Sequence, residues 1–287
     1  AHLAHDNAVG AHTQRVDDQL ANVDLSAALH IGRSRFQAHE VALRTQQVIA
    51  LETNDRNPDV RVTIIRGGGA CFSSGYDLAG DLMVSPPFHT APGDGEWARQ
   101  VTDNWFRFWD LAKPVIAQVH GYAIAGATEL VQACDLVYVA DDARISYPIV
   151  RVASPPDCQY HEPLLGMRRA MEIMLTGGEM LGPEAAQIGW ANRSFPAVDL
   201  DEEVLDVAAQ IAAVATDLAQ INKRMVHRQA EIMGVRAAIR AGSEFQALAG
   251  HQASVEAFKE DPLGSMKRHN AADAERREAR EQRRSAK

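Results

Sequence analysis

The chain has 287 residues, of which 46% are hydrophobic and 23% are charged, and its formal net charge is −9. This length fits one large domain, or one domain with an appendage, and the composition is ordinary for a globular protein with a sizeable core. The negative charge argues against nucleic-acid binding by the whole surface, although a local basic pocket for a phosphorylated ligand remains compatible with it.

The cysteine content and the hydropathy indicate the compartment. Cys71, Cys134 and Cys158 are an odd number without paired spacing, which predicts a reduced, cytoplasmic protein. No apolar run approaches the ~18 residues that a membrane span needs. The N-terminus lacks the cationic and apolar regions of a secretion signal, so we expect neither a membrane partner nor export.

The first third of the chain alternates between irregular and periodic segments. Residues 1–34 hold scattered His, Asn and Asp side chains with little periodicity, and we treat them as an atypical N-terminal segment. Apolar residues at helical spacing predict a helix over 35–52, followed by a turn at 54–59 and a buried strand at Val62–Ile65. Three prolines in 81–96 predict a loop, either a lid over a ligand or an ordinary surface excursion.

The middle of the chain repeats a pattern of strand, turn and helix. A helix is predicted over 97–112, where four aromatic residues cluster and serve either the core or a ligand platform. Strands are predicted at 114–119, 136–140 and 144–148, with a buried helix at 129–135. This repetition predicts an α/β fold of ββα-type units stacked as a spiral, followed by a helix-rich region over 164–260.

Two segments of small residues could each expose backbone N–H groups. Cys71–Leu78 and His120–Leu130 each follow an apolar strand and are expected to lead into a helix, whose first N–H groups have no partner within it. Two such turns on neighbouring strands could direct two N–H groups at one carbonyl oxygen. That arrangement is an oxyanion hole, which stabilises negative charge developing on the oxygen.

These segments resemble the crotonase (enoyl-CoA hydratase/isomerase) superfamily over roughly residues 58–260. The match is nearly continuous from Lys113 to Leu130, and shorter matches follow in the same order at 133–135, 175–177 and 185–189. The resemblance implies a crotonase-like spiral of repeated ββα units with a helical C-terminal trimerisation region. We accordingly divide the chain into the atypical segment 1–34, a spiral core over 35–196, a helical region over 197–262 and a charged tail over 263–287. In 1–34 the family has a β-hairpin whose characteristic turn this sequence lacks.

The resemblance also implies the residues of the oxyanion hole. The two donors would be the N–H groups of Tyr76 and Gly126, while Ala127 stands in the place of the second glycine of the family's pair. Gly126 could instead be a glycine required only for helix packing. The residues expected to line the substrate site around these donors are Ser74, Gly75, Asp77, Leu78 and Ala125.

The carboxylates of the site depart from the family pattern. Glu129 matches the family's first catalytic glutamate, although a buried glutamate at a helix N-terminus can also serve backbone donors. Family hydratases carry a second glutamate after a proline, where this chain has Pro148 followed by Ile149. Asp157 corresponds to an aspartate that acts as base or nucleophile in dienoyl-CoA isomerases and other members, so it could restore a two-carboxylate site. It could equally be a helix N-cap.

The resemblance therefore implies an enzyme that acts on an acyl-CoA thioester. The nominal activity is enoyl-CoA hydratase, with an enoyl- or dienoyl-CoA isomerase as the close alternative and a catalytically weak acyl-CoA-binding protein as a rival of another class. No cofactor is expected, since CoA is part of the substrate, and no metal site is expected, since the histidines lack ligand spacing. The implied assembly is a homotrimer or a dimer of trimers.

Two features near the C-terminus bear on partners. An apolar stripe predicts a helix with one buried face, formed by Val204, Leu205, Ala208, Ile211 and Val214. The tail Lys267–Lys287 contains eight Lys and Arg residues against four Asp and Glu, a net charge of +4. We expect a solvated helix or a frayed terminus there, with binding to an acidic partner or nucleic acid as the alternative.

Overall fold

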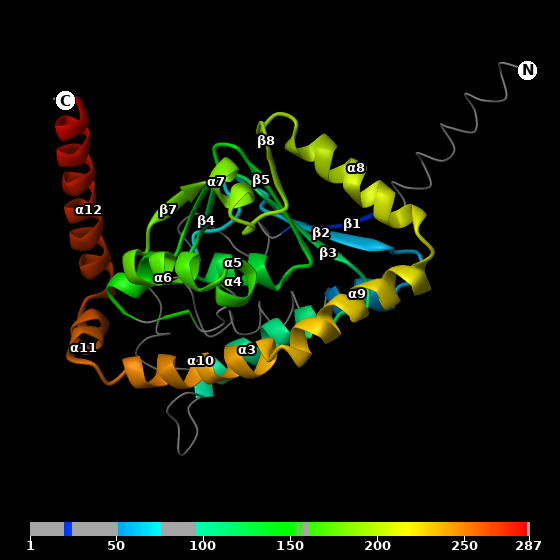
Figure 1. The fold of residues 1–287 in the computed structure, drawn as a ribbon, viewed down its shortest axis with the longest axis horizontal. Coiled ribbons are helices and arrows are strands. Elements are labelled where there is room, and N and C mark those ends of the chain that lie inside the picture. Colours follow the sequence, from blue (N-terminus) through cyan, green and yellow to red (C-terminus); the bar gives the residue numbers. More distant parts are fainter. Residues whose placement is uncertain (1–19, 25–50, 76–95, 154, 157–160, 286–287) are drawn as a thin grey trace, which may run out of the picture.

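The computed structural model describes residues 20–24, 51–75, 96–153, 155–156 and 161–285. In this part, strands gather in the centre and helices surround them (Figure 1). The chain winds as a spiral in which successive turns add a strand to one sheet and then a strand to another. This is the α/β spiral that the sequence predicts.

The larger sheet has five parallel strands in the order β1-β2-β3-β5-β8. Their bounds are β1 Leu20–Asp24, β2 Val62–Arg66, β3 Val115–Val119, β5 Leu136–Ala140 and β8 Arg193–Phe195. The described burial is nearly complete along β2, β3 and β5, because a parallel sheet covered on both faces requires apolar runs instead of alternation. The predicted strands at 62–65, 114–119 and 136–140 are therefore confirmed within one residue at their ends.

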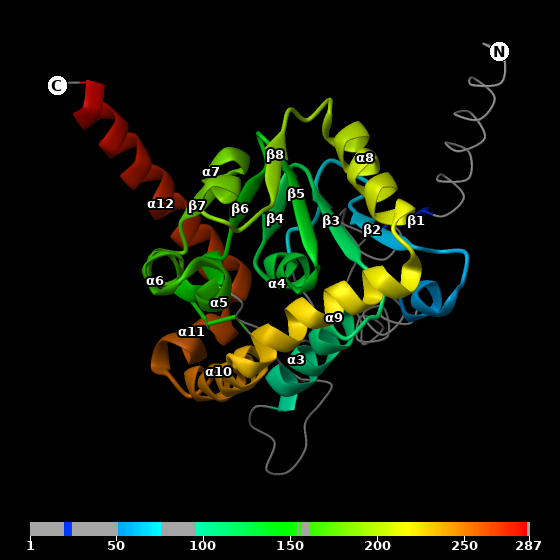
Figure 2. The ribbon, with the colours of Figure 1, turned by 45° about the vertical axis from the view of Figure 1, so that its right-hand side comes forward.

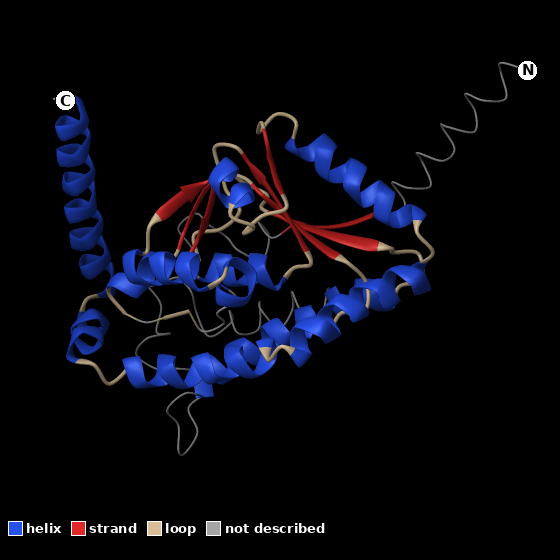
Figure 3. Cartoon of the chain, viewed as in Figure 1, coloured by secondary structure: helices blue, strands red, loops and turns tan. Residues whose placement is uncertain are grey.

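The smaller sheet has the order β4-β6-β7 and lies beside the larger one (Figure 3). It consists of β4 Tyr122–Ile124 and β6 Arg144–Ser146, which are parallel, and β7 Glu179–Leu181, which is antiparallel to β6. Only two residues separate β3 from β4, and only three separate β5 from β6. Each β–β step thus carries the chain directly from the large sheet to the small one.

Helices of the spiral lie between these strands. They are α3 Glu96–Trp109, α4 Gly126–Ala133, the 3₁₀ helix η2 Pro148–Arg151, α5 His161–Leu165, α6 Met167–Thr176 and α7 Gly182–Gln187. Every residue of α4 is buried. The aromatic cluster on α3 is confirmed as core for Trp105, Phe106 and Phe108, which are all buried.

The C-terminal region consists of five helices. They are α8 Leu200–Ala213, α9 Thr216–Ile232, α10 Val235–Ala249, α11 Ala253–Glu260 and α12 Pro262–Ser285. Helix α8 packs on strands of the large sheet, α10 packs beside α3, and α12 projects away from the rest (Figure 2). The charged tail is thus helical as far as Ser285, and a 3.0 Å ion pair between Arg151 and Asp273 joins the middle of α12 to η2.

Two differences from the sequence predictions concern the helix before β2 and the apolar stripe. Residues 51–56 are helical, so the turn predicted at 54–59 begins later than expected, and residues 35–50 of the predicted helix lie outside the described residues. The predicted buried face of α8 is confirmed for Val204 and Ala208, which are fully buried on this chain's own sheet, but Leu205 and Val214 are 40% and 39% exposed. The strand β1 lies in the segment that we called atypical, and it pairs in parallel with β2. The remainder of 1–34 lies outside the described residues, as does the predicted loop at 81–96 apart from its last residue.

Among the described helices, none is by itself long and apolar enough to cross a membrane. Helices α8 and α9 meet that test only as a pair, by length and composition, and they are bent by 107° relative to each other.

Candidate active site

The two predicted donor turns lie side by side. The Phe72 N–H donates to the carbonyl of His120 at 2.9 Å, and the Ser73 N–H donates to the carbonyl of Tyr122 at 2.9 Å. The Ile124 N–H returns a bond of 3.1 Å to the carbonyl of Ser73. This short parallel pairing exists because β2 and β3 are neighbours in the sheet and deliver both turns to the same edge.

Gly75 brings the first turn close to the start of α4. Its φ is +90°, and a Cβ added there would lie 2.6 Å from the Ile124 carbonyl oxygen and 3.1 Å from the Gly126 nitrogen. A side chain would therefore clash, and glycine is required for both its conformation and its size. The half-buried Gly75 thus adjoins the Gly126 N–H, and the exposed Ser74 precedes it.

The second turn has an unusual backbone at Ala125. Its φ of 54° and ψ of −127° match the first central position of a type II′ turn, which normally belongs to glycine. Three hydrogen bonds hold it there: its own N–H donates to Ser146, and the Thr128 N–H and hydroxyl both donate to its carbonyl, at 2.7–3.0 Å. Our expectation placed the missing glycine at Ala127, and this was wrong, because Ala127 lies within α4 and Ala125 holds the left-handed position.

Gly126 is the first residue of α4, so its N–H has no partner within the helix. The backbone N–H groups at a helix start attract negative charge. Glu129 follows one turn later on the same helix and has 0% exposure. A backbone donor and a carboxylate therefore occupy the same buried helix end, beside the first turn.

Two side-chain donors hold the Glu129 carboxylate. The Trp105 indole N–H of α3 donates to Oε2 at 3.3 Å, and the Tyr147 hydroxyl donates to Oε1 at 3.0 Å. Trp105 and Tyr147 are themselves buried. Both of these donors are side chains from other elements of the fold.

A family model described as enoyl-CoA hydratase/isomerase matches residues 33–264. The chain belongs to this family. Its place in the crotonase superfamily, predicted from the sequence, is thereby confirmed.

Individual relatives agree with the family. The chain is 28% identical over 186 residues to a mitochondrial enoyl-CoA hydratase of Pongo abelii, covering 64% of this chain and 62% of that protein. It is 31% identical over 195 residues to a peroxisomal Delta(3,5)-Delta(2,4)-dienoyl-CoA isomerase of Arabidopsis thaliana, covering 64% and 70%. The match thus spans about three fifths of the length of the first of these relatives.

A solved structure shares the fold. The enoyl-CoA hydratase/isomerase from Xanthobacter autotrophicus Py2 has a TM-score of 0.73 and 29% identity, covering 80% of this chain and 88% of that one. The family and the fold therefore rest on independent comparisons of sequence and structure.

Several predicted site residues fall outside the described part of the chain. These are Tyr76, Asp77 and Leu78 after the first turn, and Asp157. Their predicted roles stay predictions. Ile149, which stands in place of the family hydratases' second glutamate, lies in η2 and is partly buried.

The sequence reasoning missed Trp105 and Tyr147 as partners of Glu129. Trp105 was assigned to the aromatic cluster, and its contact depends on how α3 packs against α4. Tyr147 directly precedes Pro148, which restricts the backbone of the residue before it, here to φ −122° and ψ 71°. The available signal was the polar ring of Tyr147, close in sequence to Ile149. Spacing alone could not show which group this ring contacts.

Another cluster of ionisable groups lies apart from the turns, around Asp135. Its carboxylate pairs with Lys223 at 2.7 Å and His227 at 2.9 Å, and it accepts a hydrogen bond from the Val115 N–H at 2.8 Å. The His227 ring stacks on Trp109 with centroids 3.9 Å apart. These contacts fasten α9 to the strand ends, which gives Asp135 a structural role.

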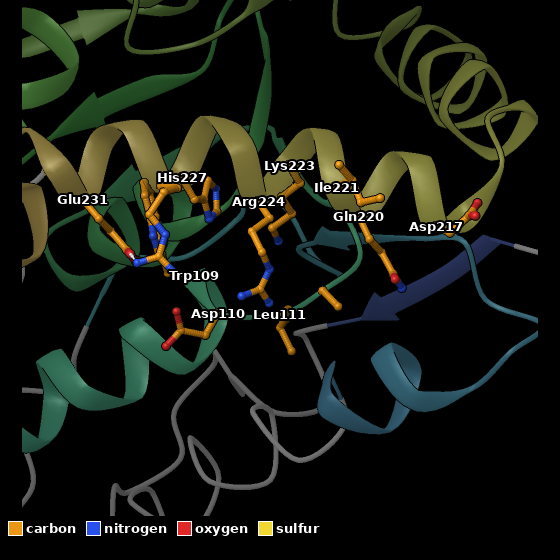
Figure 4. Close-up of a pocket in the computed structure, with 12 residues that line it drawn as sticks. Trp109, Asp110, Leu111, Asp217, Gln220, Ile221, Lys223, Arg224, His227 and Glu231 are labelled. Carbon is orange, nitrogen blue, oxygen red and sulfur yellow. Dashed lines mark ion pairs between the residues drawn. The ribbon is translucent and has the colours of Figure 1, made fainter.

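A cavity of about 410 Å³ opens beside this cluster, between the end of α3 and helix α9 (Figure 4). Charged side chains line it from both sides: Asp110 follows the end of α3, and Arg224 and Glu231 come from α9. None of the predicted site residues lines it, so it is separate from the candidate active site. Within the described ranges, no group of three or more His, Cys, Asp or Glu side chains could hold a metal ion.

Proposed function

We propose that this protein acts on an acyl-CoA thioester, and that its reaction is the hydration of an enoyl-CoA. One observation carries the proposal: the Gly126 N–H and the fully buried Glu129 share the start of α4, next to the turn that ends in Gly75. A carbonyl oxygen at this helix end would meet a backbone donor, and the atoms next to that carbonyl would lie near a carboxylate. Family membership supplies the substrate class.

In the proposed mechanism, the thioester oxygen accepts hydrogen bonds from the N–H groups of Gly126 and Tyr76. Glu129 takes a proton from water as the water oxygen bonds to the β-carbon, and the π electrons move toward the thioester to give an enolate. The two N–H groups stabilise the charge on its oxygen, and one such donor is typically worth roughly 100- to 1000-fold in rate. Glu129 returns the proton to the α-carbon and completes the addition; alternatively a protonated Asp157 supplies it, and the proton held by Glu129 must then return to Asp157 before the next turnover.

An isomerase is the second candidate, and a specific observation favours it. Ile149 cannot take or give a proton, and it stands where hydratases carry the second glutamate. A single carboxylate can still remove a proton from one carbon of an enoyl chain and return it to another, which shifts the double bond without adding water. The relative named as a dienoyl-CoA isomerase shows that this activity is also found among similar proteins.

We further propose that the protein assembles as a trimer or a pair of trimers. Helix α9 supports this, since none of its residues is buried and its apolar side chains are largely exposed. Leu218, Ile221, Met225, Val226 and Ile232 are between 54% and 79% exposed. Apolar surface of this extent is typical of faces that meet another subunit. No separate cofactor enters the proposal, because CoA arrives with the substrate.

The decisive experiment is turnover on a panel of enoyl-CoA and dienoyl-CoA esters. We expect measurable turnover by the wild-type protein and a loss on the order of 100-fold or more in Glu129→Gln, as for a positioned acid or base. Glu184→Gln is the matched control, since Glu184 is exposed on α7. Affinity for acyl-CoA without turnover on any ester would identify a binding protein and contradict the proposal.

A further inference from the structure

The Glu129 carboxylate is oriented from two sides by neutral donors. Trp105 comes from α3 and contacts Oε2, while Tyr147 comes from the junction of β6 and η2 and contacts Oε1. The terminal torsion of a glutamate has a broad energy profile, so a carboxylate without such contacts rotates freely. One donor to each oxygen removes that freedom.

The contacts also favour one protonation state. Burial disfavours a charged carboxylate, and hydrogen bonds donated to the charged form offset this effect. Neutral donors stabilise the charged carboxylate without placing a second charge beside the reacting carbons. A phenol at 3.0 Å and an indole at 3.3 Å therefore suit a carboxylate that must act as a base while buried.

We infer that Tyr147 and Trp105 are positioning residues that hold the Glu129 carboxylate in one orientation and in its basic form. The inference rests on the proposed function, in which Glu129 moves protons. It explains how a single buried carboxylate can act as a base in a site that has Ile149 in place of a second carboxylate. Pro148 restricts the backbone from which the Tyr147 phenol reaches the carboxylate.

Several ionisable groups on the packed elements are paired elsewhere. On α3, Asp103 pairs with Arg240 and Arg107 pairs with Glu52. On the small sheet, Arg144 pairs with Glu179 and lies over the ring of Tyr122. None of these pairs involves Glu129 or Tyr147, so none of them is broken when the Tyr147 hydroxyl is removed.

The test is the pH dependence of kcat/KM for Tyr147→Phe, measured with an ester that the wild-type protein turns over. Removing a donor to the charged form makes the carboxylate ionise at higher pH, so the acidic limb should move up by about one unit. We expect kcat to fall about tenfold with KM nearly unchanged, because a misoriented base affects the reaction more than binding. Trp105→Phe should shift the limb in the same direction but less, since its bond is longer.

Tyr138→Phe is the matched control. Tyr138 is also buried, but it lies on β5 and stacks near Phe195, with centroids 6.2 Å apart. It should leave the limb in place. If Tyr147→Phe lowers only the thermal stability and leaves kcat and the acidic limb of the pH profile as in the wild type, the positioning role is wrong. The proposed function still stands in that case as long as Glu129→Gln is inactive. Should Tyr147→Phe fail to fold, an unshifted limb in Trp105→Phe would overturn the inference.

Discussion

Helices α4 and α9 differ in how completely the rest of the chain buries them. Every residue of the eight-residue α4 is buried, while none of the seventeen residues of α9 is. α4 begins at Gly126 and carries Glu129 beside Trp105 of α3 and Tyr147, which lies between β6 and η2, whereas α9 is fastened through Lys223 and His227 at Asp135. The comparison suggests that one copy of the chain positions the predicted catalytic carboxylate, and that α9 serves contacts between copies.

The largest expected effect tests the α9 side of this comparison. Ile221→Asp combined with Met225→Asp places two charges on one exposed apolar face, because residues four apart are neighbours on a helix. Burial of each such side chain contributes about 1.5–3 kcal/mol, so the double substitution should convert a trimer into monomers. Light scattering at micromolar concentration measures the mass.

The matched control adds the same charge at polar positions of α9, Asn222→Asp with Gln229→Asp, and should leave the mass unchanged. A wild-type protein that is already monomeric would show that the exposed face of α9 does not mediate assembly. An unchanged trimer in the Ile221→Asp, Met225→Asp protein would place the interface elsewhere.

The second prediction tests whether α4 provides the whole acid–base chemistry. If Glu129 and Asp157 share it, Asp157→Asn should lower kcat by on the order of 100-fold, and the loss in the Glu129→Gln double variant should be less than additive. Asp142→Asn, at an exposed position, serves as the control. Full activity in Asp157→Asn would show that Asp157 only caps a helix and that Glu129 acts with Tyr147.

A third prediction concerns the attachment of α9. Lys223→Met removes a partner from the Asp135 carboxylate, which keeps the Val115 N–H and His227. We expect the free energy of unfolding to fall by about 1.5–3 kcal/mol, the range for a hydrogen bond to a charged group. Arg224→Met, one residue along and exposed, should change it by less than about 0.5 kcal/mol. Urea denaturation at one fixed protein concentration makes the comparison, and equal values for both variants would remove Asp135 as the anchor of α9.

The smallest effect belongs to the turn before α4. Ala125→Gly should relieve a backbone strain of order 1–3 kcal/mol, offset by about 0.5–1 kcal/mol of added freedom in the unfolded chain. A modest net stabilisation should follow. Ala127→Gly lies inside the helix and should instead destabilise the protein by roughly 0.5–1 kcal/mol. Urea midpoints that fall equally in both variants would show that the turn does not strain Ala125.

Much of the fold could be predicted from the sequence because it depends on local pattern. The apolar runs of β2, β3 and β5 are continuous, and the two turns of small residues mark where each strand ends. The start of α4 was placed three residues late, since Gly126, Ala127 and Thr128 resemble a loop in composition.

The site could be predicted only in part, because its remaining features depend on packing. Ala125 and Ala127 are the same residue type, and only the backbone shows which one occupies the glycine position. Trp105 and Tyr147 lie 24 and 18 residues from Glu129 in sequence, and no spacing rule links them. Similarly, the apolar stripes of α8 and α9 look alike in sequence, but α8 covers the sheet and α9 does not.

A structure of the protein with a bound acyl-CoA tests the central claim most directly. The account predicts a thioester oxygen about 3 Å from the Gly126 nitrogen, with the acyl carbons next to that carbonyl facing the Glu129 carboxylate. A carbonyl oxygen that points away from Gly126, or a ligand bound instead in the cavity between α3 and α9, would contradict it.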